Sequence, residues 1–249
     1  MHIINDFDIS MFDDYLIKMM IRGVKVLKKH VPTKAAVMTP GILLKIHDLF
    51  DLTSANDCTY WALFTLAFFL LARKSNLVPD SVTKFDGSKQ LTRGDFKITP
   101  DSLNVTLKWS KTNQAGRLEI FPLLKNEGNK LCPLKAYQKM VNACPADDAS
   151  PAFLVKRYGK LRTVTYRQYQ EKIKSCVLAI GLDPAHFTSH SFRRGGATYA
   201  FQCGLSGSFI KKLGDWSSDA YLEYIDCPLA DRVEAGRMIR DKINLEHLG

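Results

Sequence analysis

The sequence lacks paired cysteines, a long apolar run and a basic leader, and each absence excludes a class of protein. The longest uncharged apolar run, CTYWALFTLAFFLLA at residues 58–72, is shorter than the ~20 residues of a membrane span and predicts a buried core helix. The first ten residues, MHIINDFDIS, are acidic where a secretory signal is basic. No CxxC pair occurs, which argues against a zinc module and for reduced thiols inside a cell; the six cysteines stand at positions 58, 132, 144, 176, 203 and 227.

Internal repeats, low-complexity tracts and a metal-ligand cluster are also missing. His186 and His190 are four residues apart, but no further ligand lies near them at a metal-like spacing. We therefore expect no metal, no cofactor and no small-molecule substrate.

What the chain does have is a full apolar complement and an excess of positive charge. Its 249 residues are 46% hydrophobic and 10% aromatic, enough for the core of one large domain with a small attachment. The formal net charge is +10 and the isoelectric point is about 9.3. This balance favours a polyanionic partner, nucleic acid first and an anionic membrane surface second.

The residue pattern predicts helices at both ends of the chain. Residues 6–30 have helical periodicity with a basic end, and a proline-bounded linker, residues 30–40, follows. Thr39 and Pro40 form an N-cap and first-turn pair. Asp57 is expected to cap the next helix, which is apolar on nearly all sides. Beyond residue 132, Pro133 and Thr165 are expected to start two further helices, and an amphipathic helix from about residue 228 to 245 closes the chain.

Between these helices the period changes to two. Residues 95–98 and 103–109 alternate apolar and polar side chains around a TPDS turn, and residues 117–124 supply a third strand after the turn KTNQAG. The predicted fold class is therefore mainly α with a small three-stranded antiparallel sheet.

The stretch TSHSFRRGGATYAFQCG, residues 188–204, places His190, Arg193 and Arg194 directly before the small residues 195–197. Cations are costly to bury unless an anion meets them, and small residues allow close approach of a backbone or ligand. A solvated surface turn would give the same letters. The alternative is an anion site, for example for phosphate.

Three other places have residue types that suit the same site. Arg73 follows the 15-residue apolar run, and Lys111 stands at the tip of the predicted hairpin WSKTNQ. The segment LGDWSSDAYLEYI, residues 213–225, contains Trp216 and Tyr224. Each signal is weak alone, whereas the order Arg, hairpin Lys, HxxR, Trp and Tyr along the chain is specific.

With these motifs the sequence resembles the tyrosine recombinase (phage integrase) family over about residues 40–235. The wording of LLARKSNL, RGDF, WSKTNQ, SHSFRRGGAT and LGDWSSDAYLEYI is similar to that of recombinases from eukaryotic mobile elements of the crypton and DIRS type. The resemblance implies the DNA breaking-rejoining catalytic fold. It also implies site-specific recombination or integration through a 3′-phosphotyrosine intermediate, without metal.

The resemblance also implies a role for each residue. Tyr224 would attack phosphorus, and Lys111 would protonate the leaving 5′ oxygen. His190 would hydrogen-bond the scissile phosphate and assist as a base, while Trp216 would pack against the site and offer its indole N–H. Guanidinium forks match phosphate oxygens, so the clamps would be Arg73 and Arg193.

Some assignments have a rival within the sequence. Tyr221 is three residues from Tyr224, and Lys108 competes with Lys111 but falls within a predicted strand. Asp215 could be mistaken for the position that many members fill with histidine, whereas aligning Trp216 there matches the branch of the family that uses tryptophan. Many members also have a carboxylate three residues after the first arginine, and here that residue is Asn76.

Further basic residues are expected to contact the DNA backbone. Arg194 is better suited to DNA or a carboxylate than to the reacting phosphate. The segment LVKRYGKLR, residues 154–162, reads either as a solvated loop or as a phosphate-binding segment through Lys156, Arg157, Lys160 and Arg162.

Three parts of the chain follow from the resemblance. Residues 1–31 would be the residual helix of a truncated core-binding domain, residues 32–39 a linker, and residues 40–249 the catalytic domain. The expected partners are double-stranded DNA and other copies in a synaptic tetramer, with no membrane; the expected location is the nucleus. Two alternatives remain open, a catalytically silent DNA-binding remnant and an enzyme like type IB topoisomerase.

Overall fold

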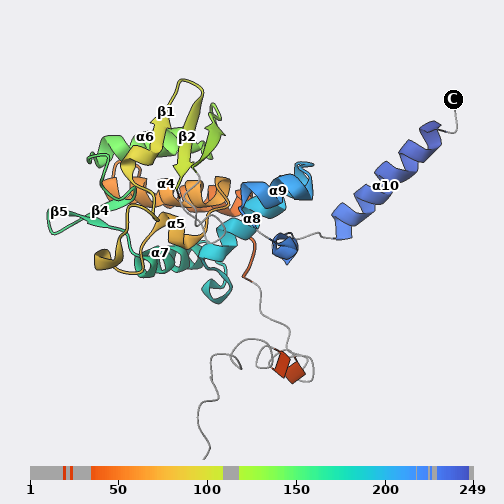
Figure 1. Ribbon diagram of the computed structural model, residues 1–249, viewed down its shortest axis with the longest axis horizontal. Coiled ribbons are helices and arrows are strands. Elements are labelled where there is room, and N and C mark those ends of the chain that lie inside the picture. The colour runs from red at the N-terminus through yellow and green to blue at the C-terminus, as the bar shows by residue number, and fades with distance from the viewer. Residues whose placement is uncertain are drawn as a thin grey trace, which may run out of the picture. The chain divides into compact units, whose positions relative to one another are not determined.

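The computed structural model describes residues 19–20, 23–24, 35–108, 118–216, 218–223, 225 and 229–246. The chain divides into two compact units, residues 1–34 and 35–249. In the first unit, the four described residues are helical. The second unit contains every element named below, and Figure 1 shows their order.

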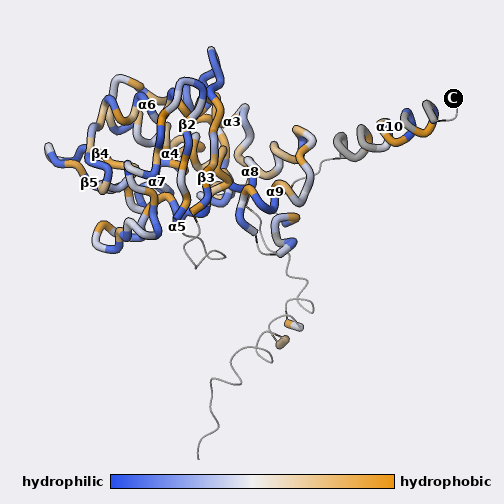
Figure 2. Tube along the Cα trace, turned by 45° about the horizontal axis from the view of Figure 1, so that its top comes forward, coloured by the Kyte–Doolittle hydropathy of each residue, from blue (hydrophilic) through white to orange (hydrophobic). Residues whose placement is uncertain are grey.

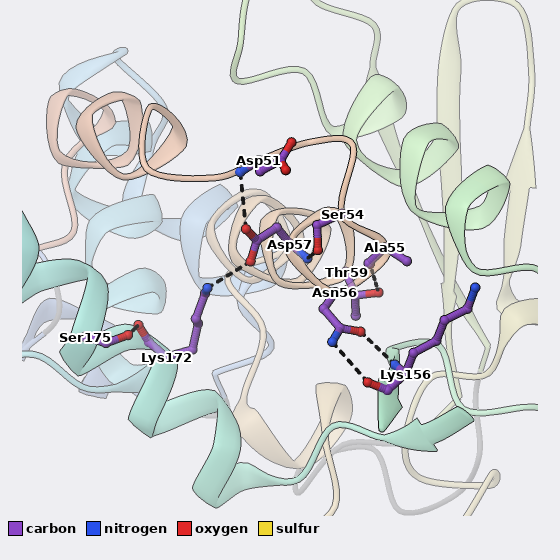
Figure 3. A network of polar contacts seen from close by, with 9 residues as sticks. All are labelled: Asp51, Ser54, Ala55, Asn56, Asp57, Thr59, Lys156, Lys172 and Ser175. Carbon is purple, nitrogen blue, oxygen red and sulfur yellow. Dashed lines mark hydrogen bonds and ion pairs between the residues drawn. The ribbon is translucent and has the colours of Figure 1, made fainter. Parts of the chain in front are cut away.

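Helix α4, Ala55–Phe69, is the central helix of the core, as the apolar run predicts. Ten of its fifteen residues are buried. Its N-cap is Ser54, whose hydroxyl accepts from the Asp57 backbone N–H, so the expectation that Asp57 caps the helix is wrong. The helix starts earlier than expected, which places Asp57 inside the first turn. Its carboxylate accepts instead from the Asp51 N–H and from Lys172 (Figure 3).

Three helices surround α4: α6 (Pro133–Ala143), α7 (Tyr166–Ala179) and α8 (Ser189–Gln202). An aromatic cluster joins α4 to two of them, with the ring of Phe64 5.0 Å from Phe192 and 5.8 Å from Tyr169. All three side chains are fully buried, and such contacts add to the stabilisation from burial itself. Pro133 and Thr165 mark the starts of α6 and α7 as expected.

The expected meander is present. Strands β1 (Phe96–Ile98), β2 (Ser102–Leu107) and β3 (Glu119–Leu124) form an antiparallel sheet in the order β1-β2-β3. Val105 pairs with Phe96 on one side and with Phe121 on the other. The sheet packs on α6, where Phe96 stacks on Tyr137 at 4.3 Å.

A second antiparallel sheet, of two strands, was not expected. Strands β4 (Leu154–Arg157) and β5 (Lys160–Thr163) form a hairpin from the basic segment that reads as a loop in the sequence. Only the first strand has a buried apolar start, Leu154 and Val155, and seven exposed residues, 156–162, follow. The alternation is too short to be recognised as a strand pair.

Helix α8 and the remaining elements complete the second unit. Helix α8 is a full 14-residue helix that begins at Ser189, so His190, Arg193 and Arg194 lie on a helix and not on a surface turn. Where α10 is coloured in Figure 2, it has both hydrophilic and hydrophobic residues. The other bounds are α3 Pro40–His47, α5 Lys74–Leu77, α9 Gly207–Leu213, α10 Leu229–Glu246, and the 3-10 turns η1 Val82–Lys84, η2 Arg93–Asp95, η3 Pro184–His186 and η4 Asp219–Glu223.

In the described part of the chain, four of the cysteines are buried thiols and Cys203 is exposed. Within the same residues no cluster of three or more metal-ligating side chains is found. No described helix is long and apolar enough to span a membrane.

Candidate active site

The site is organised by the first turn of α8, which a capping box fixes. The Thr188 hydroxyl accepts from the His190 N–H, and the Ser191 hydroxyl accepts from the Thr188 N–H. These bonds satisfy N–H groups that a helix start leaves unpaired. His190 and Arg193 are three residues apart and therefore lie on neighbouring positions of this turn, as the HxxR pattern predicts.

Two glycines allow α8 to approach the rest of the core. A Cβ atom on Gly195 would lie 1.9 Å from the carbonyl oxygen of Met38, and one on Gly196 would lie 2.3 Å from that of Phe68. The expectation that these glycines permit close packing is confirmed. The extended segment before α3 is bound to the same region, since the Met38 N–H donates to the Ser191 carbonyl at 3.0 Å.

Arg193 is a buried cation held by contacts inside the protein. Its side chain donates from Nη1 to the Leu71 carbonyl and from Nη2 to the Gly214 carbonyl at 2.6 Å. The guanidinium also lies 3.7 Å from the centre of the Trp216 ring. Only 3% of the residue is exposed, so these contacts offset the cost of removing a charge from water.

Arg73 is held by the residue next to Gly214. Its Nη1 is 2.8 Å from the Asp215 carboxylate, and its Nη2 donates to the Asp215 carbonyl at 2.6 Å. About a quarter of each side chain is exposed. Asp215 adopts a φ of +52°, in the left-handed region. In the sequence, Asp215 is notable only as a rival for the histidine position. Its pairing with Arg73 was not predicted, because residues so far apart in the chain share no local sequence signal.

The arginine pair, Arg73 and Arg193, therefore converges on one short turn. The two guanidiniums bind the consecutive residues Gly214 and Asp215, although they come from the start of α5 and from α8. Trp216 folds back over this turn so closely that a Cβ on Gly214 would lie 1.7 Å from its ring. The structure thus brings together Arg73, Arg193 and Trp216, as the order of motifs predicts.

His190 is exposed and lies in the first turn of α8. Partial burial is the main cause that lowers its pKa, and the positive charges of Arg193 and Lys74 lower it further. A lowered pKa favours the neutral ring near pH 7, and a neutral imidazole can accept a proton. Lys74 belongs to the same electrostatic environment and also lies 3.9 Å above the Tyr166 ring.

The two lysine candidates differ in what is known of them. Lys111 lies outside the described residues, so its role stays a prediction. Lys108 follows the last residue of β2, and its Nζ is 2.7 Å from the Asp95 carboxylate. The expectation that Lys108 lies within the strand is wrong by one residue, because the ladder ends at the pair Leu107–Glu119.

The two tyrosine candidates differ in the same way. Tyr224 lies outside the described residues, and its role as nucleophile stays a prediction. The Tyr221 ring lies 6.3 Å from Trp216, and a Cβ on Gly207 would lie 2.5 Å from the Tyr221 hydroxyl. Tyr221 thus takes part in packing beside the site.

Asn76 is buried in α5, and its backbone links Arg73 to Leu91, which lies just before η2. Its N–H donates to the Arg73 carbonyl at 3.0 Å, and its carbonyl accepts from Leu91 at 2.8 Å. An amide suits this position because it carries no charge that burial would penalise.

The residues expected on the DNA backbone fall into two places. Arg194 donates to the Ala35 carbonyl at 2.6 Å and so fastens the segment before α3 to α8. A DNA contact by Arg194 stays a prediction. The four others are exposed in the hairpin of β4 and β5: Lys156, Arg157, Lys160 and Arg162.

Comparison with solved structures gives the fold of the tyrosine recombinase catalytic domain. The XerH site-specific recombinase, in a post-cleavage complex with a palindromic difH substrate, matches with a TM-score of 0.59 and 14% identity, over 84% of this chain and 55% of that one. XerA recombinase matches with a TM-score of 0.58 and 17% identity, over 90% of this chain and 75% of that one. A lambda integrase(75-356) dimer bound to a COC′ core site matches with a TM-score of 0.55 and 18% identity, over 82% and 62%.

The chain spans about half the length of XerH. No model of a known protein family matches the sequence, and no curated protein matches it. At these identities the likeness shows the fold, and the mainly α class with a small antiparallel sheet is confirmed.

Proposed function

We propose that this protein cleaves and rejoins DNA strands without metal, through a 3′-phosphotyrosine intermediate, in site-specific recombination. The observation that carries the proposal is the convergence of Arg73 and Arg193 on Gly214 and Asp215, beside His190. Two guanidiniums at one turn, and an imidazole three residues from Arg193 in α8 with a lowered pKa, are groups that can bind a phosphodiester and take a proton. The fold in which they converge is that of recombinases.

In the proposed reaction each residue has one task. The Tyr224 oxygen attacks phosphorus while the bond to the 5′ oxygen breaks, and the arginine pair stabilises the charge on the non-bridging oxygens. His190 accepts the tyrosine proton, and Lys111 donates a proton to the leaving 5′ oxygen. The phosphotyrosine preserves the energy of the broken bond, so rejoining is the same step reversed.

Asp215 sets a condition on this reaction. One oxygen of its carboxylate and its backbone carbonyl accept from the two terminal nitrogens of Arg73, the same nitrogens that would donate to a phosphate. We infer that the scissile phosphate replaces the Asp215 carboxylate on Arg73 when DNA binds. The turn at Asp215 would then hold Arg73 in place in the free protein.

The proposal extends to the partners and the wider role. Double-stranded DNA as the partner is supported by the net charge of +10, and the XerH and lambda integrase structures are complexes with DNA sites. The motif wording supports a mobile-element origin of crypton or DIRS type, and the family resemblance supports a synaptic tetramer. A nuclear location follows from the DNA substrate and the eukaryotic type of the motifs.

The test is covalent trapping. The full chain is incubated in EDTA with nicked duplexes from the ends of its genomic neighbourhood and run on denaturing gels, beside Tyr224→Phe and Tyr221→Phe. We expect an adduct that only Tyr224→Phe removes. Loss only in Tyr221→Phe would move the nucleophile to Tyr221. Strand exchange between two duplexes separates a recombinase from an enzyme like type IB topoisomerase.

A DNA-binding protein without catalysis is the second candidate. It is favoured by the Asp215 carboxylate, which already binds one of the two arginines that the reaction needs. Salt-sensitive binding to the same nicked duplexes with no adduct in any variant would support this candidate and contradict the first.

A further inference from the structure

The hairpin of β4 and β5 is fixed at its base to the core helix. The Asn56 side chain makes two hydrogen bonds with the backbone of Lys156, donating to its carbonyl at 3.1 Å and accepting from its N–H at 2.7 Å. The Thr59 hydroxyl donates to the Leu154 carbonyl at 2.7 Å. Figure 3 shows how α4 presents these side chains to β4. The hairpin is therefore held in one orientation relative to α4.

Three cations share one face of this hairpin, which we call the cationic hairpin. Arg157 pairs directly with Lys160, and Arg162 pairs with Val155. Directly opposed residues and residues two apart lie on the same face of a strand pair, which places Arg157, Lys160 and Arg162 together. Among the described residues, none of the three has a carboxylate within salt-bridge distance. Opposed like charges destabilise a hairpin, so folding alone does not account for this face.

The tip of the cationic hairpin carries an unexpected residue. Tyr158 and Gly159 form a two-residue turn with φ of +49° and +72°. Positive φ at both positions is the signature of a turn that favours Asn-Gly or Asp-Gly, because a bulkier side chain is strained there. The tyrosine gains nothing in return from packing, since its relative exposure is 104%.

A groove lies between the cationic hairpin and the first turns of α7. The groove has a volume of about 780 Å³ and is lined by Arg162, Thr165 and other residues of the hairpin and α7. Glu171 also lines the groove, but its carboxylate binds Arg167 at 2.8 Å. The residue after Thr165 is Tyr166, whose ring lies under Lys74, and the charge of Lys74 acts on His190.

We propose that the cationic hairpin is a second contact with the same DNA duplex, at a distance from the cleaved phosphate. Arg157, Lys160 and Arg162 bind backbone phosphates, and the ring of Tyr158 enters the major groove, which is wide enough for a two-stranded ribbon. Charge complementarity selects a polyanion, and the proposed function supplies one, the duplex bound at the arginine pair. The inference rests on the proposed function.

The test separates the ring from the charges. Binding of a labelled 30-base-pair duplex to the full chain is followed by fluorescence anisotropy across a salt series. The variants are Tyr158→Asn, Tyr158→Phe and the triple change of Arg157, Lys160 and Arg162 to Gln. The matched control removes the same number of charges from exposed lysines of α6 and α7, by changing Lys135, Lys139 and Lys174 to Gln.

Tyr158→Asn is informative because Asn suits the turn better than Tyr, so the variant should melt no lower than wild type. We expect its affinity to fall about tenfold with an unchanged salt slope, since the lost contact is not ionic. Tyr158→Phe should bind like wild type. The triple variant should lose up to about 2.7 from the slope of log affinity against log salt, at about 0.9 per phosphate, and the control should lose less than one.

Two results would overturn the inference. If wild type binds with a steep salt slope while Tyr158→Asn and the triple variant bind within twofold of it, the cationic hairpin is not a contact and the proposed function stands. If wild type does not bind the duplex at all, both fail. Adduct formation at saturating protein gives an independent readout, which the lysine control variant should retain.

Discussion

The arginine pair and the cationic hairpin carry the same kind of charge in opposite settings. Arg193 is 3% exposed, and it contacts the carbonyl groups of Leu71 and Gly214 and the indole ring of Trp216. Arg73 binds a carboxylate. Arg157, Lys160 and Arg162 are exposed, and among the described residues no carboxylate neutralises them.

The difference shows what each setting is suited to. A buried guanidinium must be partnered, and those partners also fix its position to the accuracy that catalysis requires. An exposed cation loses little by remaining unpaired and stays available to a long polyanion. The arginine pair therefore contributes accurately placed groups for the reaction, whereas the hairpin contributes positive charge for DNA binding.

The largest effect is expected from the packing behind the arginine pair. Gly195→Ala places a Cβ 1.9 Å from the Met38 carbonyl, so the backbone of α8 must move. We expect a loss of about 3 kcal/mol in the free energy of unfolding, measured by urea denaturation. Gly236→Ala in α10, where nothing lies within 4 Å, is the matched control and should cause no loss. Equal stabilities of the two variants would contradict the close packing.

The same substitution in both regions tests the contrast directly. Arg193→Lys loses at least one of two carbonyl bonds and the stacking on Trp216, because an ammonium has no planar fork. We expect about 2 kcal/mol of destabilisation and an adduct yield reduced about a hundredfold. Arg162→Lys should change neither beyond twofold in yield or ~0.3 kcal/mol in stability. Comparable losses at both positions would remove the distinction between position and charge.

A smaller effect is expected at the carboxylate that binds Arg73. Asp215→Asn retains the backbone preference for positive φ but removes the charge that competes with phosphate. DNA affinity should rise severalfold at low salt, about fivefold, while stability falls by about 1 kcal/mol because Arg73 loses an ionic partner. Filter binding and urea denaturation give the two values. Weaker DNA binding in this variant would mean that Asp215 does not compete with DNA.

The smallest effect is a pH dependence through His190. The pKa of His190 is lowered in the folded protein. At pH values below the ordinary pKa of histidine, the unfolded chain therefore binds the proton more readily than the folded protein, and the free energy of unfolding decreases as the pH is lowered. A bound phosphate would raise the same pKa. DNA affinity should therefore increase as pH falls from 8 to 6, and His190→Gln should flatten this dependence. A profile unchanged by the substitution would place the phosphate away from His190.

Several features of the molecule were predictable because their signals are local. The apolar run became α4, and Thr39, Pro133 and Thr165 mark helix starts where their chemistry places them. Caps, turns and alternation are properties of a few neighbouring residues. The start of α4 at Ser54 and the short strands β4 and β5 were missed because competing caps and brief patterns look alike in sequence.

The periodicity of the sequence determined the fold class. The order of motifs singled out Arg73, His190, Arg193 and Trp216, since each motif has its own residue chemistry. Only the tertiary structure decided how these groups are held. Asp215 binds Arg73, the carbonyls of Leu71 and Gly214 bind Arg193, and Asn56 fixes the hairpin to α4. Such bonds join residues remote along the chain, and their formation depends on the burial and backbone geometry that folding creates.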